Sequence, residues 1–471
     1  MISRHSAKQR FLMRLIPVFV LALAIRVLCA IPAFQETDRL LRPDSASYLF
    51  PAYALAEDGE MNMRPRNDPG KVAFSGAFRR DDAIDYVDQR PAVQRPPGYI
   101  VFLAALRLIF GRSPVAFALA GCLIGALTVF PVGLTGFQLA GRRAGFWAAV
   151  LYALNLTSLA VAPLILSDTL LGFLVAFQAM YLVKSMRTGR LRDFVFGTTF
   201  AAAAVLVKPV NIPVLILLLM TAPFVMKTRR RTVCAMLLVP LVSAVIIVPW
   251  MLRNRAVGAG FAVDRNSGLT ALHNTAAILA HANHSDANEV RARLENEANK
   301  EYNLQEREEW CLKRYREAIL AHPRSAVATH LFQVWILLPD LPDFLQNLGL
   351  RTGERGTLAV LRKDGVLAAF RHYMDGSYAA AFLSAPFVLI HAALWVLTAL
   401  GIWVYARRKR WTVLIVCLLP MVYYLMAAGP VVLPRYQIPA LPFACAMAGA
   451  VISVGGIRRW RKRRSCRRCN P

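Results

Sequence analysis

Residues 227–250 read KTRRRTVCAMLLVPLVSAVIIVPW, and this stretch decides the fold class of the chain. A lysine and three arginines come first, and an almost wholly apolar run from residue 232 to residue 250 follows. An apolar run of this length crosses a lipid bilayer as one helix. Because basic residues gather at the cytoplasmic ends of membrane spans, the stretch predicts a spanning helix that begins at the cytoplasmic surface.

The same pattern recurs and predicts an all-α polytopic membrane protein with about ten spans. Basic clusters fill every second gap between apolar runs, which places both termini in the cytoplasm. The fifth and sixth runs meet at Lys208-Pro209, so they form either two helices or one bent helix. The runs lie at residues 11–31, 114–140, 144–165, 168–186, 194–208, 209–226, 232–250, 380–406, 411–429 and 433–457. The clusters are Arg142-Arg143, Lys184 to Arg192, Lys227 to Arg231, Arg407 to Arg410 and Arg458 to Arg468.

Composition agrees with a membrane protein and excludes a soluble domain. Of the 471 residues 56% are hydrophobic, the formal net charge is +28 and the mean hydropathy is +0.43. Soluble domains of this size do not combine these values. Most of the basic excess flanks the apolar runs, where anionic lipid attracts it, so we expect membrane lipids and no nucleic acid as partners. The run 11–31 is near full spanning length, and we expect an uncleaved first helix there.

The predicted topology divides the chain into four parts. Residues 1–250 form an N-terminal transmembrane catalytic module, and its first external loop occupies residues 32–96. Residues 251–379 form a large, mostly helical region on the non-cytoplasmic side. Residues 380–457 contribute the C-terminal transmembrane helices, and residues 458–471 form a basic cytoplasmic tail. We expect the short apolar stretch Tyr99 to Phe110 to lie at the membrane interface, because it is too short to span.

Two polar points in the first external loop are candidates for chemistry. Asp44 follows Pro43 and precedes an amphipathic segment that begins near Tyr48. This position is typical of a helix N-cap, and it equally suits a catalytic carboxylate at the membrane surface. Arg95 precedes Pro96-Pro97-Gly98, which predicts a rigid turn before a helix. Arg95 either lies at the interface as a snorkelling side chain or faces an anionic group.

The other polar candidates share the same predicted face. Asp168 opens the fourth span, where an acid is costly unless it meets water or a partner. Lys208, Arg253 and Arg435 lie at span ends, and Trp250 and Tyr436 suit interfacial anchors. The three cations are therefore either anchors or ligands of a phosphate, which arginine and lysine both bind.

These motifs in this order resemble the GT-C class of polytopic glycosyltransferases. Within that class they resemble most the family of protein O-mannosyltransferases and aminoarabinose transferases of lipid A. The resemblance extends over nearly the whole chain and implies a GT-C-like helical bundle with juxtamembrane helices outside the cytoplasm. The motifs are Asp44 to Tyr48, Arg-Pro-Pro-Gly-Tyr at 95–99, Ser167-Asp168, Lys208-Pro209, Pro-Trp-x-x-Arg-Asn at 249–254, and Arg-Tyr-x-x-Pro-x-x-Pro at 435–442.

The resemblance also implies an activity: inverting transfer of a sugar from a polyprenyl-phosphate donor to a lipid, glycan or protein hydroxyl, on the periplasmic face of a cell inner membrane. By matching position, Asp44 is the expected general base and Asp168 a second polar contact. No obligatory cofactor is expected. A divalent metal is possible, because four residues are candidates for a second acid of the first loop: Asp58, Asp81, Asp82 and Asp85. The expected donor-phosphate ligands are Lys208, Arg253 and Arg435, and the expected substrate pocket is lined by Tyr48, Arg95, Tyr99 and Tyr436.

Three other functions fit parts of the pattern. An envelope-polysaccharide polymerase or ligase also has many spans and large external loops, but it uses a pyrophosphate-linked donor. A lipid-linked sugar transporter would carry polar residues deep in several spans and an internal repeat, and the sequence has no visible repeat. A catalytically silent accessory subunit would retain the fold without the chemistry.

Overall fold

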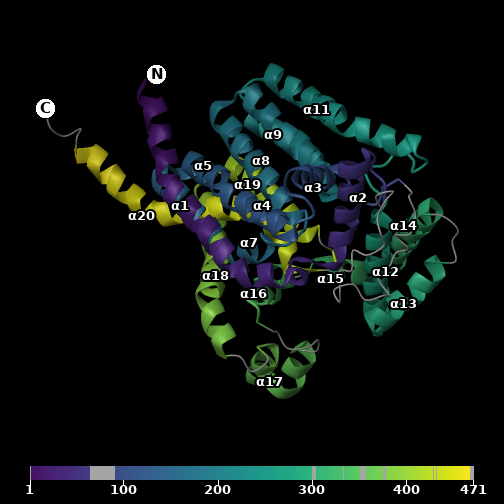
Figure 1. The fold of residues 1–471 in the computed structure, drawn as a ribbon. Helices are drawn as coiled ribbons and strands as arrows, with labels where there is room; N and C mark the ends of the chain where they lie inside the picture. Colours follow the sequence, from purple (N-terminus) through teal and green to yellow (C-terminus); the bar gives the residue numbers. More distant parts are fainter. Residues whose placement is uncertain are drawn as a thin grey trace.

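The computed structural model describes residues 2–63, 91–299, 304–331, 334–350, 357–374, 378–427, 429–430 and 432–466. Over these residues the protein is helical, and a single isolated bridge, between Asn62 and Pro91, is its only β pairing. Figure 1 shows long helices gathered into one bundle, with a group of shorter helices at one end. The start of α1 and the last described turns of α20 lie on the side away from these shorter helices. The all-α fold class is therefore confirmed.

The helices of the bundle coincide with the apolar runs of the sequence. Six of them are long and apolar enough to cross a membrane, and three further apolar helices are shorter. The number of spans therefore stays a prediction. The helices are α1 (Ile2–Gln35), α4 (Pro114–Leu127), α5 (Val129–Ala140), α6 (Arg142–Ala153), α7 (Leu156–Val161), α8 (Asp168–Thr188), α9 (Leu191–Val205), α10 (Ile212–Val225), α11 (Arg229–Ala256), α18 (Tyr378–Arg407), α19 (Trp411–Met426) and α20 (Leu441–Cys466).

Breaks in the helices fall where the backbone hydrogen bonding changes. The predicted run 144–165 is not one helix: α6 ends at Ala153, and α7 starts after Asn155, whose side chain accepts from Ser158 N–H. The question left open at Lys208-Pro209 is resolved as two helices. Proline has no N–H and disfavours a helical residue before it, so α9 ends and a short 3-10 turn precedes α10.

Small residues set the spacing within the bundle. The helices α5, α6 and α20 pack on one another. A Cβ atom on Gly145 of α6 would lie 2.5 Å from the carbonyl oxygen of Gly133 on α5. One on Gly449 of α20 would lie 2.4 Å from the carbonyl oxygen of Ala144. Glycine is therefore required at these crossings, because the backbones approach more closely than any side chain allows.

The first helix contains a fully buried arginine that the sequence pattern did not single out. Arg26 donates to Ser158 Oγ at 2.7 Å and to the carbonyl of Ala153, at the end of α6, at 3.2 Å. Its guanidinium lies 5.9 Å from the Tyr152 ring centroid. A positive charge at a helix C-terminus is favourable, so Arg26 stabilises the break between α6 and α7.

The external helices form two groups around the site. The first contains α12 (Ser267–Asn283), α13 (Ala287–Ala298), α14 (Leu304–Ala321) and α15 (Pro323–Leu331), and these helices pack on one another. Figure 1 shows this group beside α2 (Ala46–Asp58), while α17 (Thr357–Tyr373) lies apart near one end of α18. Between them, the 3-10 turn η5 (Val334–Leu337) and α16 (Leu341–Asn347) return the chain to the bundle. The interfacial stretch predicted after Tyr99 corresponds to α3 (Pro97–Phe110), which packs on α2.

Candidate active site

A short turn presents Asp44 beside the bundle. The turn is the 3-10 segment Pro43–Ser45, which leads directly into α2. Ser45 Oγ accepts from the Arg42 N–H and donates to the carbonyl of Ile165, so the turn is fixed to the chain just before α8. The N-cap of α2 is Ser45. The cap alternative for Asp44 therefore does not describe its contacts, because both its carboxylate oxygens face arginines.

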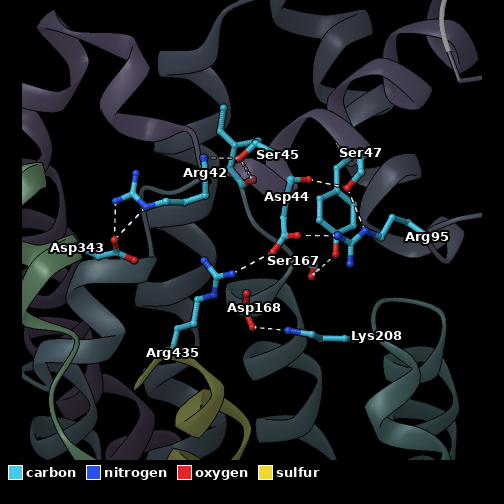
Figure 2. Close-up of polar contacts among 12 residues, drawn as sticks. Arg42, Asp44, Ser45, Ser47, Arg95, Ser167, Asp168, Lys208, Asp343 and Arg435 are labelled. Carbon is cyan, nitrogen blue, oxygen red and sulfur yellow. Dashed lines mark hydrogen bonds and ion pairs between the residues drawn. The ribbon is translucent and has the colours of Figure 1, made fainter. Parts of the chain in front are cut away.

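The two arginines that hold Asp44 come from distant parts of the chain (Figure 2). Arg95 Nη2 donates to Asp44 Oδ1 at 2.7 Å, and Arg435 Nη2 donates to Asp44 Oδ2 at 3.0 Å. Arg95 also donates to Ser47 Oγ at 2.9 Å, and Ser47 donates to the Asp44 carbonyl. The Asp44 side chain keeps 39% of its area exposed, against 16% for Arg95 and 10% for Arg435. Asp44 is thus ionised and held by two arginines, and its side chain is still accessible.

The charges around Asp44 set its protonation state. Burial raises the pKa of a carboxyl group, but the positive charges of Arg95, Arg435 and Lys208 outweigh burial and hold the pKa of Asp44 below its ordinary value. A carboxylate with this pKa is ready to accept a proton at neutral pH, provided that the proton donor becomes acidic during the reaction.

A second ion pair lies next to the first. Lys208 Nζ donates to Asp168 Oδ1 at 2.9 Å, and the Asp168 side chain is buried. Lys208 comes from the break between α9 and α10, and Asp168 begins α8. Lys208 Nζ also lies 4.8 Å from the Tyr436 ring centroid, and the Arg435 guanidinium lies 5.7 Å from the same ring. Tyr436 therefore lies against both cations.

Aromatic rings support the arginine side of the site. The Arg95 guanidinium lies 5.0 Å from the Tyr48 ring centroid, and Tyr99 meets Tyr48 edge to face at 5.1 Å. The hydroxyl of Tyr48 is 3.0 Å from Ser167 Oγ. Both tyrosines are almost fully buried, so in this structure they form the wall behind Arg95.

Arg253 is the one predicted site residue that the described contacts do not place in this group. Its guanidinium donates to the carbonyls of Met61 and Ala92 at 2.8 Å each and lies 4.8 Å from the Trp250 ring centroid. The Ala92 N–H donates to the Met61 carbonyl at 2.9 Å. Arg253 therefore joins two points of the first external loop, Met61 and Ala92. The further first-loop acids Asp81, Asp82 and Asp85 lie outside the described residues.

Two acids of the external region reach the site, and sequence reasoning missed both. Arg42 donates to Asp343 Oδ1 from Nη2 at 2.7 Å and from Nε at 2.9 Å (Figure 2). Asp340 is almost fully buried in the same turn. Burial and the neighbouring charge of Asp343 raise the pKa of Asp340 to about 8, although Arg435 and Arg42 oppose the shift. The only sequence signal was an acidic pair, Pro-Asp-Leu-Pro-Asp at 339–343.

The site as a whole is an array of alternating charges. One nitrogen of the array, Arg435 Nε, is buried with no hydrogen-bond partner. A buried unpaired donor is costly, and here it belongs to one of the cations of the array. No group of three or more metal-binding side chains gathers within the described parts of the chain. The acids of the array are Asp44, Asp168, Asp340 and Asp343, and its cations are Arg42, Arg95, Lys208 and Arg435.

A comparison with protein families identifies the class of this site. Residues 94–252 match the family model described as dolichyl-phosphate-mannose-protein mannosyltransferase. This part of the chain is therefore similar to a family of GT-C membrane glycosyltransferases. The match contains Arg95, Asp168 and Lys208 and covers about a third of the chain, so the resemblance drawn from the motifs is confirmed and the multi-pass membrane location with it. No curated protein matches the chain.

Solved structures of an archaeal oligosaccharyltransferase, from Archaeoglobus fulgidus, are similar in fold. The apo form is 14% identical with a TM-score of 0.49, covering 96% of this chain and 52% of that one. The complex of this enzyme, AglB, with an inhibitory peptide and a dolichol-phosphate is 14% identical with a TM-score of 0.48, covering 96% and 51%. The complex with Zn and sulfate is 12% identical with a TM-score of 0.47, covering 93% and 49%. The chain spans about half the length of these solved structures.

Proposed function

We propose that this glycosyltransferase moves a sugar from a polyprenyl-phosphate donor to a hydroxyl of a lipid, glycan or protein, on the non-cytoplasmic face of the membrane. The observation that carries the proposal is the carboxylate of Asp44, accessible and shared between Arg95 and Arg435. The match to a family described by a dolichyl-phosphate-mannose donor supports the same donor class.

In the proposed reaction the acceptor hydroxyl attacks the anomeric carbon of the donor sugar. The bond from that carbon to the phosphate oxygen breaks as the new glycosidic bond forms, which inverts the configuration. The hydroxyl proton moves to Asp44, which becomes neutral. The departing polyprenyl phosphate gains the negative charge that Asp44 loses. Charge therefore moves from the carboxylate to the phosphate during the step.

Arg435 can stabilise first the charge on Asp44 and then the charge on the departing phosphate. In the ligand-free site its Nη2 is bonded to Asp44 and its Nε has no partner. A phosphate that binds Nε would neutralise part of the guanidinium and loosen the bond to Asp44. As Asp44 takes up the proton, the whole guanidinium becomes available to the phosphate. Donors that strengthen their contact in the transition state contribute most to catalysis, and Arg435 has this property.

We assign supporting roles to the second ion pair. Lys208 is a point charge that assists the leaving phosphate, and Asp168 holds it in place and contacts the sugar or the acceptor. Tyr436 lies against both Lys208 and Arg435 and lines the sugar pocket with Tyr48 and Tyr99. Arg253, in contrast, donates to the carbonyls of Met61 and Ala92, and its role as a phosphate ligand stays a prediction.

The charge of the array favours a donor with one phosphate over a pyrophosphate. With Asp340 neutral below its pKa of about 8, the array carries one positive charge more than it has negative charges. A sugar linked through one phosphate to a prenyl chain is a phosphodiester with one negative charge, whereas a pyrophosphate link carries two. This balance argues against the polymerase or ligase alternative.

The function is tested with purified full-length protein in lipid vesicles. We expect sugar transfer from one member of a panel of polyprenyl-phosphate sugars and none from pyrophosphate-linked or nucleotide-linked sugars. Mass spectrometry of envelope glycans and lipids, from cells with and without the gene, then identifies the acceptor by one missing sugar. Transfer from a pyrophosphate-linked donor alone would instead establish the polymerase or ligase alternative.

A further inference from the structure

The Arg435 turn is held by one buried amide side chain. Gln437 lies two residues after Arg435 in the 3-10 segment Pro434–Ala440 and is fully buried. Its Nε2 donates to the carbonyls of Pro434, Ile336 and Leu338 at 2.9, 2.9 and 2.8 Å. Its Oε1 lies 3.3 Å from Trp395 Nε1, whose N–H is shared with His391 Nε2 at 3.2 Å. A buried amide with every group paired fixes its surroundings, because any movement leaves polar atoms unpaired.

The residues that Gln437 holds belong to the external region. The segment 336–343 contains the end of η5 and the first residues of α16. His391 of α18 contacts the Leu337 carbonyl at 2.9 Å, and the Asp340 N–H donates to Thr157 Oγ1 of α7 at 3.1 Å. The helices α18 and α7 and the Arg435 turn therefore hold this segment along its length.

The far end of the same segment holds the Asp44 turn. Asp343 accepts two hydrogen bonds from Arg42, which precedes Pro43 and Asp44 in the chain. Both partners are largely buried, at 11% and 16% exposed. One stretch of eight residues is thus bonded at one end to the turn that carries the phosphate ligand and at the other to the turn that carries the base.

We propose that Gln437 is a positioning residue of this glycosyltransferase, and that through it the segment 336–343 sets the place of Arg435 relative to Asp44. This inference rests on the proposed function. Reacting groups lose much of their rate when they are displaced by about 1 Å, so the segment has a direct effect on catalysis without touching substrate. The Tyr436 ring lies between Arg435 and Gln437 in the chain, so the same amide also orients the aromatic contact of Lys208.

The chain offers a matched control for Gln437. Gln178 is also fully buried, lies within α8, and neither polar atom of its side chain has a hydrogen-bond partner. Replacement of Gln178 by methionine therefore removes a buried amide of the same size but no hydrogen bond to the site. A second variant, Trp395→Phe, removes the indole N–H that bonds Gln437 Oε1 and retains most of the ring volume.

The experiment measures binding of decaprenyl phosphate to full-length protein in detergent by native mass spectrometry. We expect Gln437→Met to weaken binding about tenfold, Trp395→Phe to weaken it by a smaller factor, and Gln178→Met to leave it unchanged, with the melting temperatures of all three within a few degrees. In the transfer assay, Gln437→Met should raise the donor KM, whereas Asp343→Asn should lower kcat without raising the donor KM.

The outcomes separate this inference from the proposed function. If the wild-type protein fails to bind decaprenyl phosphate, the proposed donor class is wrong. If the wild-type protein and all three variants, Gln178→Met, Gln437→Met and Trp395→Phe, bind decaprenyl phosphate equally well, the positioning role is wrong. The proposed donor class would then stand. Equal loss of binding and of thermal stability in Gln437→Met and Gln178→Met would also overturn the positioning role, because it would reflect the loss of any buried amide.

Discussion

Replacement of Asp44 by asparagine separates the catalytic role of this residue from a structural one. Asparagine retains one oxygen, so it can accept from Arg95 or from Arg435 but not from both, and one charge-assisted bond is lost. Because the Asp44 side chain is 39% exposed, this loss costs the folded state about 1 kcal/mol or less. Loss of a general base lowers the rate by about 100-fold to 10,000-fold. We expect transfer to fall by this factor while the protein stays folded.

The same substitution has a second, opposite effect on donor binding. Asp44 accepts from Arg435 and would compete with a donor phosphate for it. Removal of its charge should therefore leave the affinity for polyprenyl phosphate unchanged or raise it a few-fold. The assay combines kcat for transfer with titration of decaprenyl phosphate. Glu57→Gln is the matched control, because Glu57 is also a carboxylate shared by two arginines, Arg107 and Arg112, near the other end of α2. Weakened donor binding in Asp44→Asn together with ordinary turnover would refute the reasoning.

Four further substitutions have expected outcomes that can be measured. Arg435→Ala should weaken decaprenyl phosphate binding about 10-fold to 100-fold, which corresponds to the free energy of one charge-assisted hydrogen bond. Arg253→Ala should weaken binding far less. Equal weakening in titrations of the two variants would restore Arg253 as a phosphate ligand. Arg95→Gln removes a charge that lowers the pKa of Asp44, so the acidic limb of the pH–rate profile should move to higher pH, and an unmoved limb would exclude Asp44 as the titrating base. Asp340→Asn should raise the melting temperature relative to wild type by about 2 °C at pH 8.5 and not at pH 4, as scanning calorimetry would measure.

The sign of the last prediction follows from proton binding. The folded protein holds the proton of Asp340 up to a pKa of about 8, whereas an unfolded chain releases it near the ordinary value of 3.8. The stability that this proton gives is complete below the unfolded pKa and is lost as the pH rises through the folded one. Asparagine does not ionise and therefore avoids the loss. A wild-type protein and an Asp340→Asn variant with parallel melting curves across this range would show that Asp340 does not titrate on folding.

Hydrophobic runs predicted the helices well, because a membrane span is coded by local composition. The break between α9 and α10 was visible in Lys208-Pro209, since proline limits both itself and the residue before it. The break between α6 and α7 was not, because it depends on Asn155 as a cap and on Arg26 from another helix. Local sequence signals therefore define a helix end only when the residues that stabilise it are also local.

The residues of the site were predictable from the sequence where their signals were local. Asp44, Arg95, Asp168, Lys208 and Arg435 were each found from a proline turn or from a charge at a span end, and the structure brings them together. Their pairing was not predictable, because it joins residues far apart in the chain.

The missed residues lack such signals. Asp343 and Gln437 act through contacts with backbone or side chains from other parts of the fold, and neither has an unusual local sequence. Arg253 shows the reverse: its motif suggested a phosphate ligand, yet its described bonds go to two backbone carbonyls.

The bonds of Arg253 have a practical consequence for work on this protein. Because Met61 and Ala92 are hydrogen-bonded to each other and to one guanidinium, the chain leaves and re-enters the framework at a single point. The chain on either side of residues 64–90 is therefore held at one join. An epitope or a protease site inserted within residues 64–90 would report which side of the membrane this part of the enzyme faces.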